Sequence, residues 1–435
     1  MSRFSASIDF QKSVLSAWIF LITTTYLMSQ ALDVYLFHFW LDIHLVVVAM
    51  VLMLLGLIPI IWREVPQCLH SLKFLALILT GWILYLFVNA AMGFNWLTSI
   101  IFLFRFIMAV LIAFEIGVCL HTRGNSARYA MFSALLASFA AITLIWYLRY
   151  IDPEFLADLV PLLRDFKFHP VESGPRAQGL YVNPNILGFA LVIHTAVLIW
   201  YGMKNKFLSL VISPTIWLVS LWGVIRTQSR NALIGMVSAG IFALLSYYKE
   251  HLSAAPKKNR VLSAVLFLTI LASSTLLIIQ HNPARWAKTL NQIATTDWRN
   301  LNERVIKQKI RQIDAARIEI WKGALRSWEQ RPWVGIGLGC FQYVPLPERH
   351  FYHAHNFLLN LLVEQGLIGS AFLAAFLAVL VKQMKDWKGI GILACFLFVQ
   401  LFEDETTSAA LPIYMSLILG YCFYLALQKR SSDMV

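Results

Sequence analysis

Charged residues are scarce in this sequence. Only 14% of the 435 residues are Asp, Glu, Lys or Arg, and 59% are hydrophobic, whereas soluble domains contain roughly 25% charged residues. This composition excludes an ordinary soluble protein and predicts an all-α polytopic membrane protein, since helices satisfy their backbone polar groups within the bilayer. We expect one integral membrane domain over residues 1–435 and no separate soluble domain.

The motifs of several common protein classes are missing as well. The five cysteines show no CxxC or Cys/His spacing, so packing is the favoured explanation for them. The sequence contains neither an ATP-binding loop with its Walker lysine nor the HExxH pattern of zinc enzymes. A cleavable leader with a small-residue cleavage site is not recognisable at the N-terminus, so we expect residues 14–32 to be a retained span.

Long apolar runs dominate what is present. About twelve runs are long enough to cross a bilayer as helices. They lie near residues 14–32, 44–61, 74–93, 97–120, 129–148, 186–203, 207–225, 231–248, 261–280, 357–381, 389–402 and 411–427.

The charges of the short connections predict the orientation of these spans. Alternate connections are rich in Lys and Arg, whereas those opposite hold Asp33, Asp42 and the acidic run at 403–405. The positive-inside rule therefore places both termini in the cytoplasm. Two long connections, about 149–185 and 281–355, then face the outside, which is the periplasm in a Gram-negative cell.

The second long connection is strongly basic, with twelve Lys and Arg against six Asp and Glu. Positive charge at this place favours anionic lipid headgroups or phosphates over nucleic acid as partner. Residues 303–331 have the periodicity of an amphipathic helix, which Pro332 ends. Arg317 interrupts its apolar stripe, and either snorkels to an interface or points at an anion. The following GIGLG could form an anion-binding nest of backbone amides, or be an ordinary glycine-rich turn.

Four polar constellations fall on the predicted outer side. They are Arg176 with the Asn-Pro-Asn turn at 183–185, Arg226 with Arg230, Arg317 with Trp321, and His353 with His355. Arg226 and Arg230 are four residues apart, a spacing that puts them on one face of a helix.

These residue types together predict transfer of a group from a phosphate or diphosphate donor. Arginines at the mouth of a bundle need anionic partners, and the fixed fork of the guanidinium suits phosphate and stabilises a charged leaving group. A histidine beside them can take the proton of an acceptor hydroxyl. Two alternatives compete: a structural, hydrogen-bonding histidine, and a zinc site formed by His350, His353 and His355.

The histidine segment also resembles a known signature. His355-Asn356 followed by Gly366 and Gly369 forms HNx9GxxG, which resembles bacterial O-antigen ligases and their relatives, the O-antigen polymerases and protein O-oligosaccharyltransferases. The other constellations resemble three further family segments, in the same order. They are R-x2-G…NPN at 176–185, T-x-[ST]-R at 227–230 and R-x3-W…P-x2-G-x-G at 317–339.

Two structural expectations concern the signature itself. His355 and Gly366 are eleven residues apart, about three helical turns, so we expect them to share one helical face. Gly366 and Gly369 are expected to let another helix pack closely.

The resemblance implies an inner-membrane glycosyltransferase that needs no metal, nucleotide or other cofactor. It would move O-antigen polysaccharide from undecaprenyl diphosphate to a sugar hydroxyl of lipid A–core in the periplasm. His355 would be the base, and Arg230 and Arg176 would bind the diphosphate. Further substrate contacts are implied for Arg226, Arg317, Asn356, His353, Asn185 and Asp404.

Other activities remain open at this point. Polymerases and protein O-oligosaccharyltransferases share the motifs, and the full HNx9GxxG signature favours the ligase among them. A transporter or flippase of a lipid-linked anion would require charges along a pathway and internal repeats. Only Arg105 and Glu115 lie deep in a predicted span, and the sequence shows no repeat.

Overall fold

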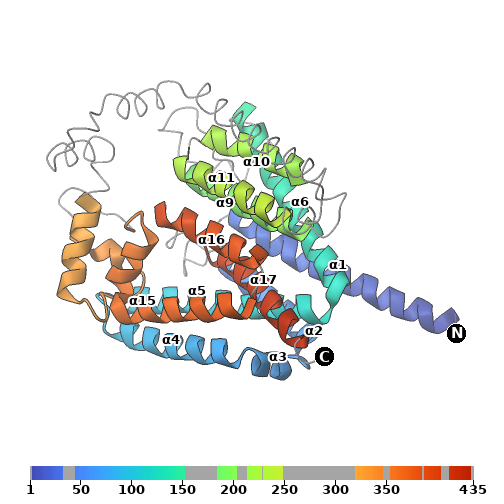
Figure 1. Ribbon diagram of the computed structural model, residues 1–435, viewed down its shortest axis with the longest axis horizontal. Coiled ribbons are helices and arrows are strands. Elements are labelled where there is room, and N and C mark those ends of the chain that lie inside the picture. The colour runs from blue at the N-terminus through green and yellow to red at the C-terminus, as the bar shows by residue number, and fades with distance from the viewer. Residues whose placement is uncertain are drawn as a thin grey trace.

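The protein is helical throughout the part of the chain that the structure describes. The computed structural model describes residues 2–32, 45–151, 184–202, 213–227, 229–247, 319–345, 353–384, 387–402 and 411–432. Within these ranges no strand occurs, which confirms the all-α prediction (Figure 1).

The helices follow the predicted apolar runs. They are α1 (Ser2–Leu32), α2 (Leu45–Ile61), α3 (Val65–Ser71), α4 (Lys73–Ala91), α5 (Trp96–Thr122), α6 (Gly124–Ile151), α9 (Pro184–Gly202), α10 (Ser213–Thr227), α11 (Arg230–Tyr247), the 3-10 helix η3 (Cys340–Tyr343), α15 (Phe357–Met384), α16 (Trp387–Phe402) and α17 (Leu411–Ser432). A further helical segment covers 319–330. Every predicted run that falls on described residues is helical there, and the run at 261–280 lies outside them.

Four of these helices are long and apolar enough to cross a membrane on their own. They are Lys73–Ala91, Trp96–Thr122, Gly124–Leu148 and Phe357–Met384. A bent pair, Val47–Ile61 with Val65–Ser71, turns by 96° and makes a fifth candidate if it counts as one span. The described residues therefore support a multi-span membrane protein, with four or five candidate spans where the sequence predicts twelve.

Helix α5 packs closely against α17 near the middle of the bundle (Figure 1). A Cβ atom on Gly117 of α5 would lie 2.7 Å from the Cβ of Phe423, and one on Gly420 of α17 would lie 3.0 Å from the carbonyl oxygen of Ala113. Small residues let membrane helices approach until their backbones touch, which is where dispersion contacts are gained. The two glycines thus fix the contact between α5 and α17.

One end of the bundle is basic. Arg123 directly follows α5, donates to the carbonyl oxygen of Ile60 and forms a 3.2 Å ion pair with Glu64 at the bend before α3. Lys73 begins α4 at this end. Helix α4 has 19 residues and is about 28 Å long at the helical rise per residue. Its opposite end contacts the signature residues.

Candidate functional site

Helix α15 is broken at Gly366, the first glycine of the HNx9GxxG signature. Its backbone has φ 65° and ψ −168°, a conformation essentially confined to glycine. A Cβ atom there would lie 2.3 Å from the carbonyl oxygen of Trp333, so a side chain has no room. The predicted common helical face of His355 and Gly366 is therefore wrong, because His355 precedes the helix and Gly366 interrupts it.

Residues 332–341, termed the docked segment, lie against this break. Four backbone hydrogen bonds of 2.9 to 3.1 Å join the two, and each side donates two. They are Ile336 N to Val363 O, Gly337 N to Glu364 O, Leu367 N to Pro332 O and Ile368 N to Trp333 O. Gly335 has φ 73°, and a Cβ on it would lie 2.5 Å from the carbonyl of Glu364. Because Gly335 and Gly366 have no side chains, the backbones of the docked segment and α15 can approach each other closely.

The glycines of GIGLG do not form the predicted anion-binding nest. The backbone amides of this stretch donate to acceptors within the protein instead. Besides the two bonds to α15, Gly335 N donates to Arg331 O, Leu338 N to Asn89 Oδ1 and the neighbouring Cys340 N to Gly337 O. The signature glycines are predicted to let another helix pack closely. This prediction is confirmed for Gly369, where a Cβ would lie 3.2 Å from Tyr85 of α4. It is wrong for Gly366, which faces the docked segment.

A single amide side chain clamps this junction from α4. Asn89 is 2% exposed, and its Nδ2 donates to the carbonyl oxygens of Val334 at 2.6 Å and Glu364 at 2.9 Å. Its Oδ1 accepts from Leu338 N at 2.9 Å. Asn89 is not among the residues predicted from the sequence. An amide inside the apolar run at 74–93 is nevertheless a signal, because polar groups in a span need partners.

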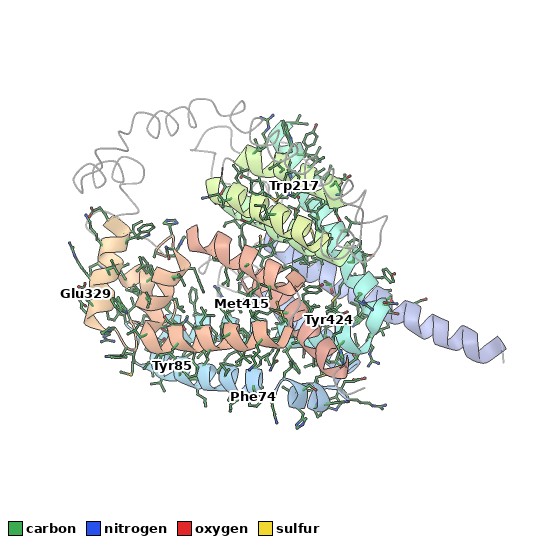
Figure 2. All side chains as sticks on the ribbon, viewed as in Figure 1. Phe74, Tyr85, Trp217, Glu329, Met415 and Tyr424 are labelled. Atoms are coloured by element: carbon green, nitrogen blue, oxygen red, sulfur yellow. The ribbon has the colours of Figure 1, made fainter. Side chains whose placement is uncertain are left out.

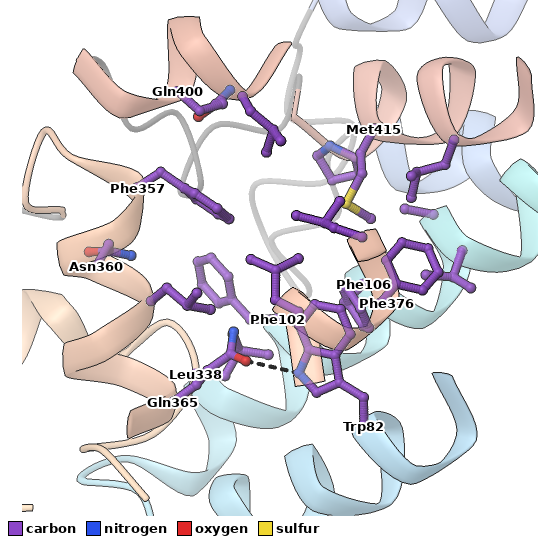
Figure 3. A pocket seen from close by; sticks show the side chains of 18 of the residues that line it. Trp82, Phe102, Phe106, Leu338, Phe357, Asn360, Gln365, Phe376, Gln400 and Met415 are labelled. Carbon is purple, nitrogen blue, oxygen red and sulfur yellow. Dashed lines mark hydrogen bonds between the residues drawn. The ribbon is translucent and has the colours of Figure 1, made fainter. Parts of the chain in front are cut away.

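Two aromatic residues of α4 extend the clamp. The hydroxyl of Tyr85 reaches the carbonyl oxygens of Val334 and Gln365, and Figure 2 shows Tyr85 between α4 and α15. The indole N–H of Trp82 donates to Gln365 Oε1 at 3.0 Å, drawn as the dashed line in Figure 3. The carbonyl oxygens of Glu364 and Gln365 and the side chain of Gln365 thus have hydrogen-bond partners on α4, as burial requires.

The two histidines lie directly before α15. Their ring centroids are 4.3 Å apart, and the rings are inclined by 59°. His355 has φ 51° and is the only non-glycine residue with a positive φ among those that the structure describes. Histidine adopts this region more readily than most residues, but such a backbone persists only where the surroundings hold it.

Ala354, between the histidines, is held at both of its backbone polar groups. Its N–H donates to Asn360 Oδ1 at 3.3 Å, and its carbonyl oxygen accepts from the indole N–H of Trp321 at 2.9 Å. Ala354 and Asn360 are 0% and 1% exposed. Residues 353–356, termed the histidine loop, are therefore held between α15 and the helical segment 319–330.

Asn356, the second residue of the signature, caps α15. Its Oδ1 accepts from Leu359 N at 3.0 Å, and its carbonyl oxygen accepts from Asn360 N at 2.9 Å. This is the arrangement of an N-cap residue, which satisfies amides at a helix start. The substrate contact that the resemblance implies for Asn356 stays a prediction.

The helical segment 319–330 confirms the described part of the predicted amphipathic helix. Ile320 and Ala324, from the predicted stripe, are buried in a small second core with Phe341 and Val363. The helix ends at residue 330, before Pro332, as predicted. The docked segment and the histidine loop share this core, which joins both to α15.

A second cluster brings together two other motifs. Helix α9 begins at Pro184 of the Asn-Pro-Asn turn, and Gly188 one turn later lies against the T-x-S-R motif. A Cβ on Gly188 would lie 2.7 Å from the Cβ of Ala232 and 3.1 Å from Thr227 Oγ1. Ser229 Oγ accepts from Ala232 N at 3.3 Å and so caps α11. Gly188 was not among the predicted site residues.

The predicted common helical face of Arg226 and Arg230 is wrong. Arg226 lies in the last turn of α10, with its guanidinium 4.3 Å from the ring centroid of Trp222. Arg230 is the first residue of α11, because Ser229 begins a new helix between them. Asn185, half-buried, lies in the first turn of α9.

An apolar cavity of about 150 Å³ lies among α4, α5, α15, α16 and α17. Phe357, which follows the histidine loop, lines it, and Gln400 of α16 lies across from Phe357 in Figure 3. Phe396 also lines the cavity and has its ring centroid 6.2 Å from that of Phe189, the residue after Gly188. The cavity therefore lies beside the histidine loop, and one aromatic contact connects its wall to α9.

The five cysteines bear out the packing interpretation, since all are buried and free. Arg105 of α5, one of the two deep charges, lines the cavity, with its guanidinium 5.5 Å from the ring centroid of Phe102. The second, Glu115, is buried in α5.

Several predicted residues lie outside the described part of the chain. They are Arg176, Arg317, Asp404 and His350, together with 152–183 and 281–318, which make up most of the two predicted outer loops. The roles predicted for these residues, and the three-histidine zinc alternative, stay predictions.

Comparison with known families finds a similar family for part of the chain. Residues 215–374 match the family described as O-antigen ligase. The matched stretch contains the T-x-S-R motif, the docked segment and the histidine signature. This confirms the predicted resemblance and supports a relationship of this segment to the O-antigen ligase and polymerase superfamily, whose members are glycosyltransferase-like enzymes. No curated protein matches the chain significantly.

Proposed function

We propose that this protein is an O-antigen ligase of a Gram-negative inner membrane. It transfers O-antigen polysaccharide from undecaprenyl diphosphate to a sugar hydroxyl of lipid A–core. The observation that carries the proposal is that the histidine loop, within the family match, directly precedes Phe357, which lines an apolar cavity. Phe396 of the same lining contacts Phe189, the residue after Gly188 of the second cluster.

The proposed reaction is a single displacement at the anomeric carbon of the polysaccharide. The acceptor oxygen forms a bond to that carbon while the bond from carbon to the diphosphate oxygen breaks. His355 takes the hydroxyl proton as general base. The diphosphate leaves with the bonding electron pair on its oxygen, stabilised by Arg230 and Arg176, with Arg226 and Arg317 as further contacts.

The remaining predicted contacts complete the proposed site. His353, whose ring lies beside that of His355, and Asn185, at the start of α9, contact the substrates. Asp404 assists from the outer loop after α16. Asp404 is two positions after Phe402, the last residue of α16, and this supports the proposal because Gln400 in the last turn of α16 lines the cavity.

The cavity suits the lipid part of the donor. Its lining is mainly Leu, Phe, Met and Val, and an apolar cavity of about 150 Å³ can hold a benzene-sized group. An isoprene unit is of similar size. Burial of that unit would place the attached diphosphate at the rim, between the arginines and His355.

We further propose that the histidine loop faces the periplasm and that both termini are cytoplasmic. Two features support this orientation. The Arg123–Glu64 end of the bundle carries the basic short connections expected in the cytoplasm. The docked segment meets the opposite end of α4, and the 19 residues of α4 roughly match the ~30 Å hydrocarbon core.

The decisive experiment replaces His355. We expect His355→Ala to fold and insert normally but to transfer no polysaccharide to lipid A–core, in cells and with purified protein. His121→Ala, at the basic end of α5, serves as the matched control and is expected to be active. Normally ligated lipopolysaccharide in cells carrying only His355→Ala would end the base assignment.

A second experiment separates the ligase from its alternatives. Purified protein receives a lipid-linked glycan and either lipid A–core, a second lipid-linked repeat or an acceptor peptide. A product on lipid A–core is the expected outcome. Elongated lipid-linked glycan alone would identify a polymerase, and glycopeptide alone a protein O-oligosaccharyltransferase. Movement across vesicles without covalent product would identify a transporter.

A further inference from the structure

The position of the His355 ring depends on Ala354. Because a side chain projects from its own Cα, the ring moves whenever the preceding backbone turns. Both polar groups of Ala354 are fixed from outside the loop, one by Asn360 of α15 and one by Trp321 of the segment 319–330. The two partners come from segments about forty residues apart, so neither alone determines the loop.

The loop needs this support for a physical reason. His355 has φ 51°, in a region that L-residues with a side chain rarely occupy and that costs free energy unless neighbouring contacts hold it. Asn360 and Trp321 are the two side chains that hydrogen-bond to the backbone immediately before it. If either bond is lost, the loop can relax towards a negative φ and carry the ring with it.

We infer that Trp321 and Asn360 are positioning residues that hold the His355 imidazole in its reactive orientation through the backbone of Ala354. This inference rests on the proposed role of His355 as general base. Base catalysis requires the ring nitrogen within hydrogen-bond reach of the acceptor hydroxyl, and a misplacement of about 1 Å can lower a rate on the order of 100-fold.

The segment 319–330 supplies a matched control. Trp328 lies two turns after Trp321, and its indole N–H also donates to a backbone carbonyl, that of Pro332 at 3.2 Å. Trp328→Phe therefore removes the same kind of hydrogen bond from the same helix, but one that goes to the docked segment and not to the histidine loop. A merely structural role for Trp321 would make the two variants alike.

The experiment measures kcat, the KM for the lipid-linked donor and the thermal midpoint of each purified variant. We expect Trp321→Phe and Asn360→Leu to lower kcat by about 10- to 100-fold, with KM within about twofold of the wild type. Asn360→Asp, which keeps an oxygen that can accept from Ala354 N, should retain most of kcat. Trp328→Phe should keep kcat while lowering the thermal midpoint about as much as Trp321→Phe does.

Specific results would overturn this inference. They are a kcat for Trp321→Phe within twofold of that of Trp328→Phe, a rise in KM without a fall in kcat, or equal losses for Asn360→Leu and Asn360→Asp. Failure of the proposed base role looks different, because His355→Ala would itself transfer polysaccharide normally, whatever the Trp321 variants do. Failure of the ligase function would appear as the absence of a lipid A–core product from the wild-type protein.

Discussion

Substitution of Gly366 by Ala tests the junction at its centre. The new Cβ would meet backbone atoms of Trp333 and Val334 at 2.3 to 2.6 Å, and backbone cannot swing aside as a flexible side chain does. The glycine-only conformation itself costs ~2 kcal/mol for alanine. Displacement of the docked segment would break at least two of its four backbone hydrogen bonds, at ~1 kcal/mol each. We expect a loss of about 4 kcal/mol, a large part of typical folding stability.

The measurement is the unfolding midpoint of purified protein in mixed detergent micelles, together with transfer activity. Gly124→Ala is the control, because Gly124 also has a positive φ, 56°, but a Cβ there would meet nothing within 4 Å. The Gly124→Ala variant therefore measures only the cost of placing an alanine at a positive φ, ~1 kcal/mol. If Gly366→Ala were no less stable than Gly124→Ala, the docked segment would not rest on the break, and the account of the signature glycine would be wrong.

Two further predictions concern the arginines and the docked segment. Arg230→Lys should reduce transfer severely, because the charge remains while the paired donors of the guanidinium are lost; near-normal transfer in a purified assay would refute diphosphate binding by Arg230. Cys340 should resist maleimide in the folded protein, since the thiol is buried and burial raises its pKa, which depletes the reactive thiolate. Trp333→Cys in the same segment, at a side chain 65% exposed, should be labelled quickly, and from the periplasmic side of intact cells. Rapid labelling of Cys340 would show that the segment is not closed on α15.

Hydrophobic periodicity and length were enough to predict the helices. Each apolar run that falls on described residues is a helix, because a span must satisfy its backbone polar groups internally. Local sequence rules also predicted that the helix ends before Pro332 and that the apolar stripe of 319–330 is buried. These features depend only on neighbouring residues, which the sequence displays directly.

The tertiary roles of the glycines could not be predicted in the same way. A glycine pattern permits helix packing, an amide nest or a strained turn, and only the partner decides among them. Gly366 turned out to face Trp333, 33 positions earlier in the chain, and the amides after Gly335 were taken by α15. Similarly, four-residue spacing puts Arg226 and Arg230 on one face only if a single helix contains both, and the cap at Ser229 prevents that.

The fixed spacing of the signature follows from one face of α15. Asn356, Asn360 and Glu364 recur every four residues, so their side chains point the same way. Asn356 caps the helix, Asn360 holds Ala354, and Glu364 accepts from the amide of Phe341 in the docked segment at 3.2 Å. The break at Gly366 comes two residues after Glu364. The carbonyl oxygens of Val363 and Glu364 just before it accept hydrogen bonds from the docked segment. Because an added or deleted residue would rotate this face by about 100°, the histidine loop and the docked segment can be held together only at the observed separation of His355 from Gly366.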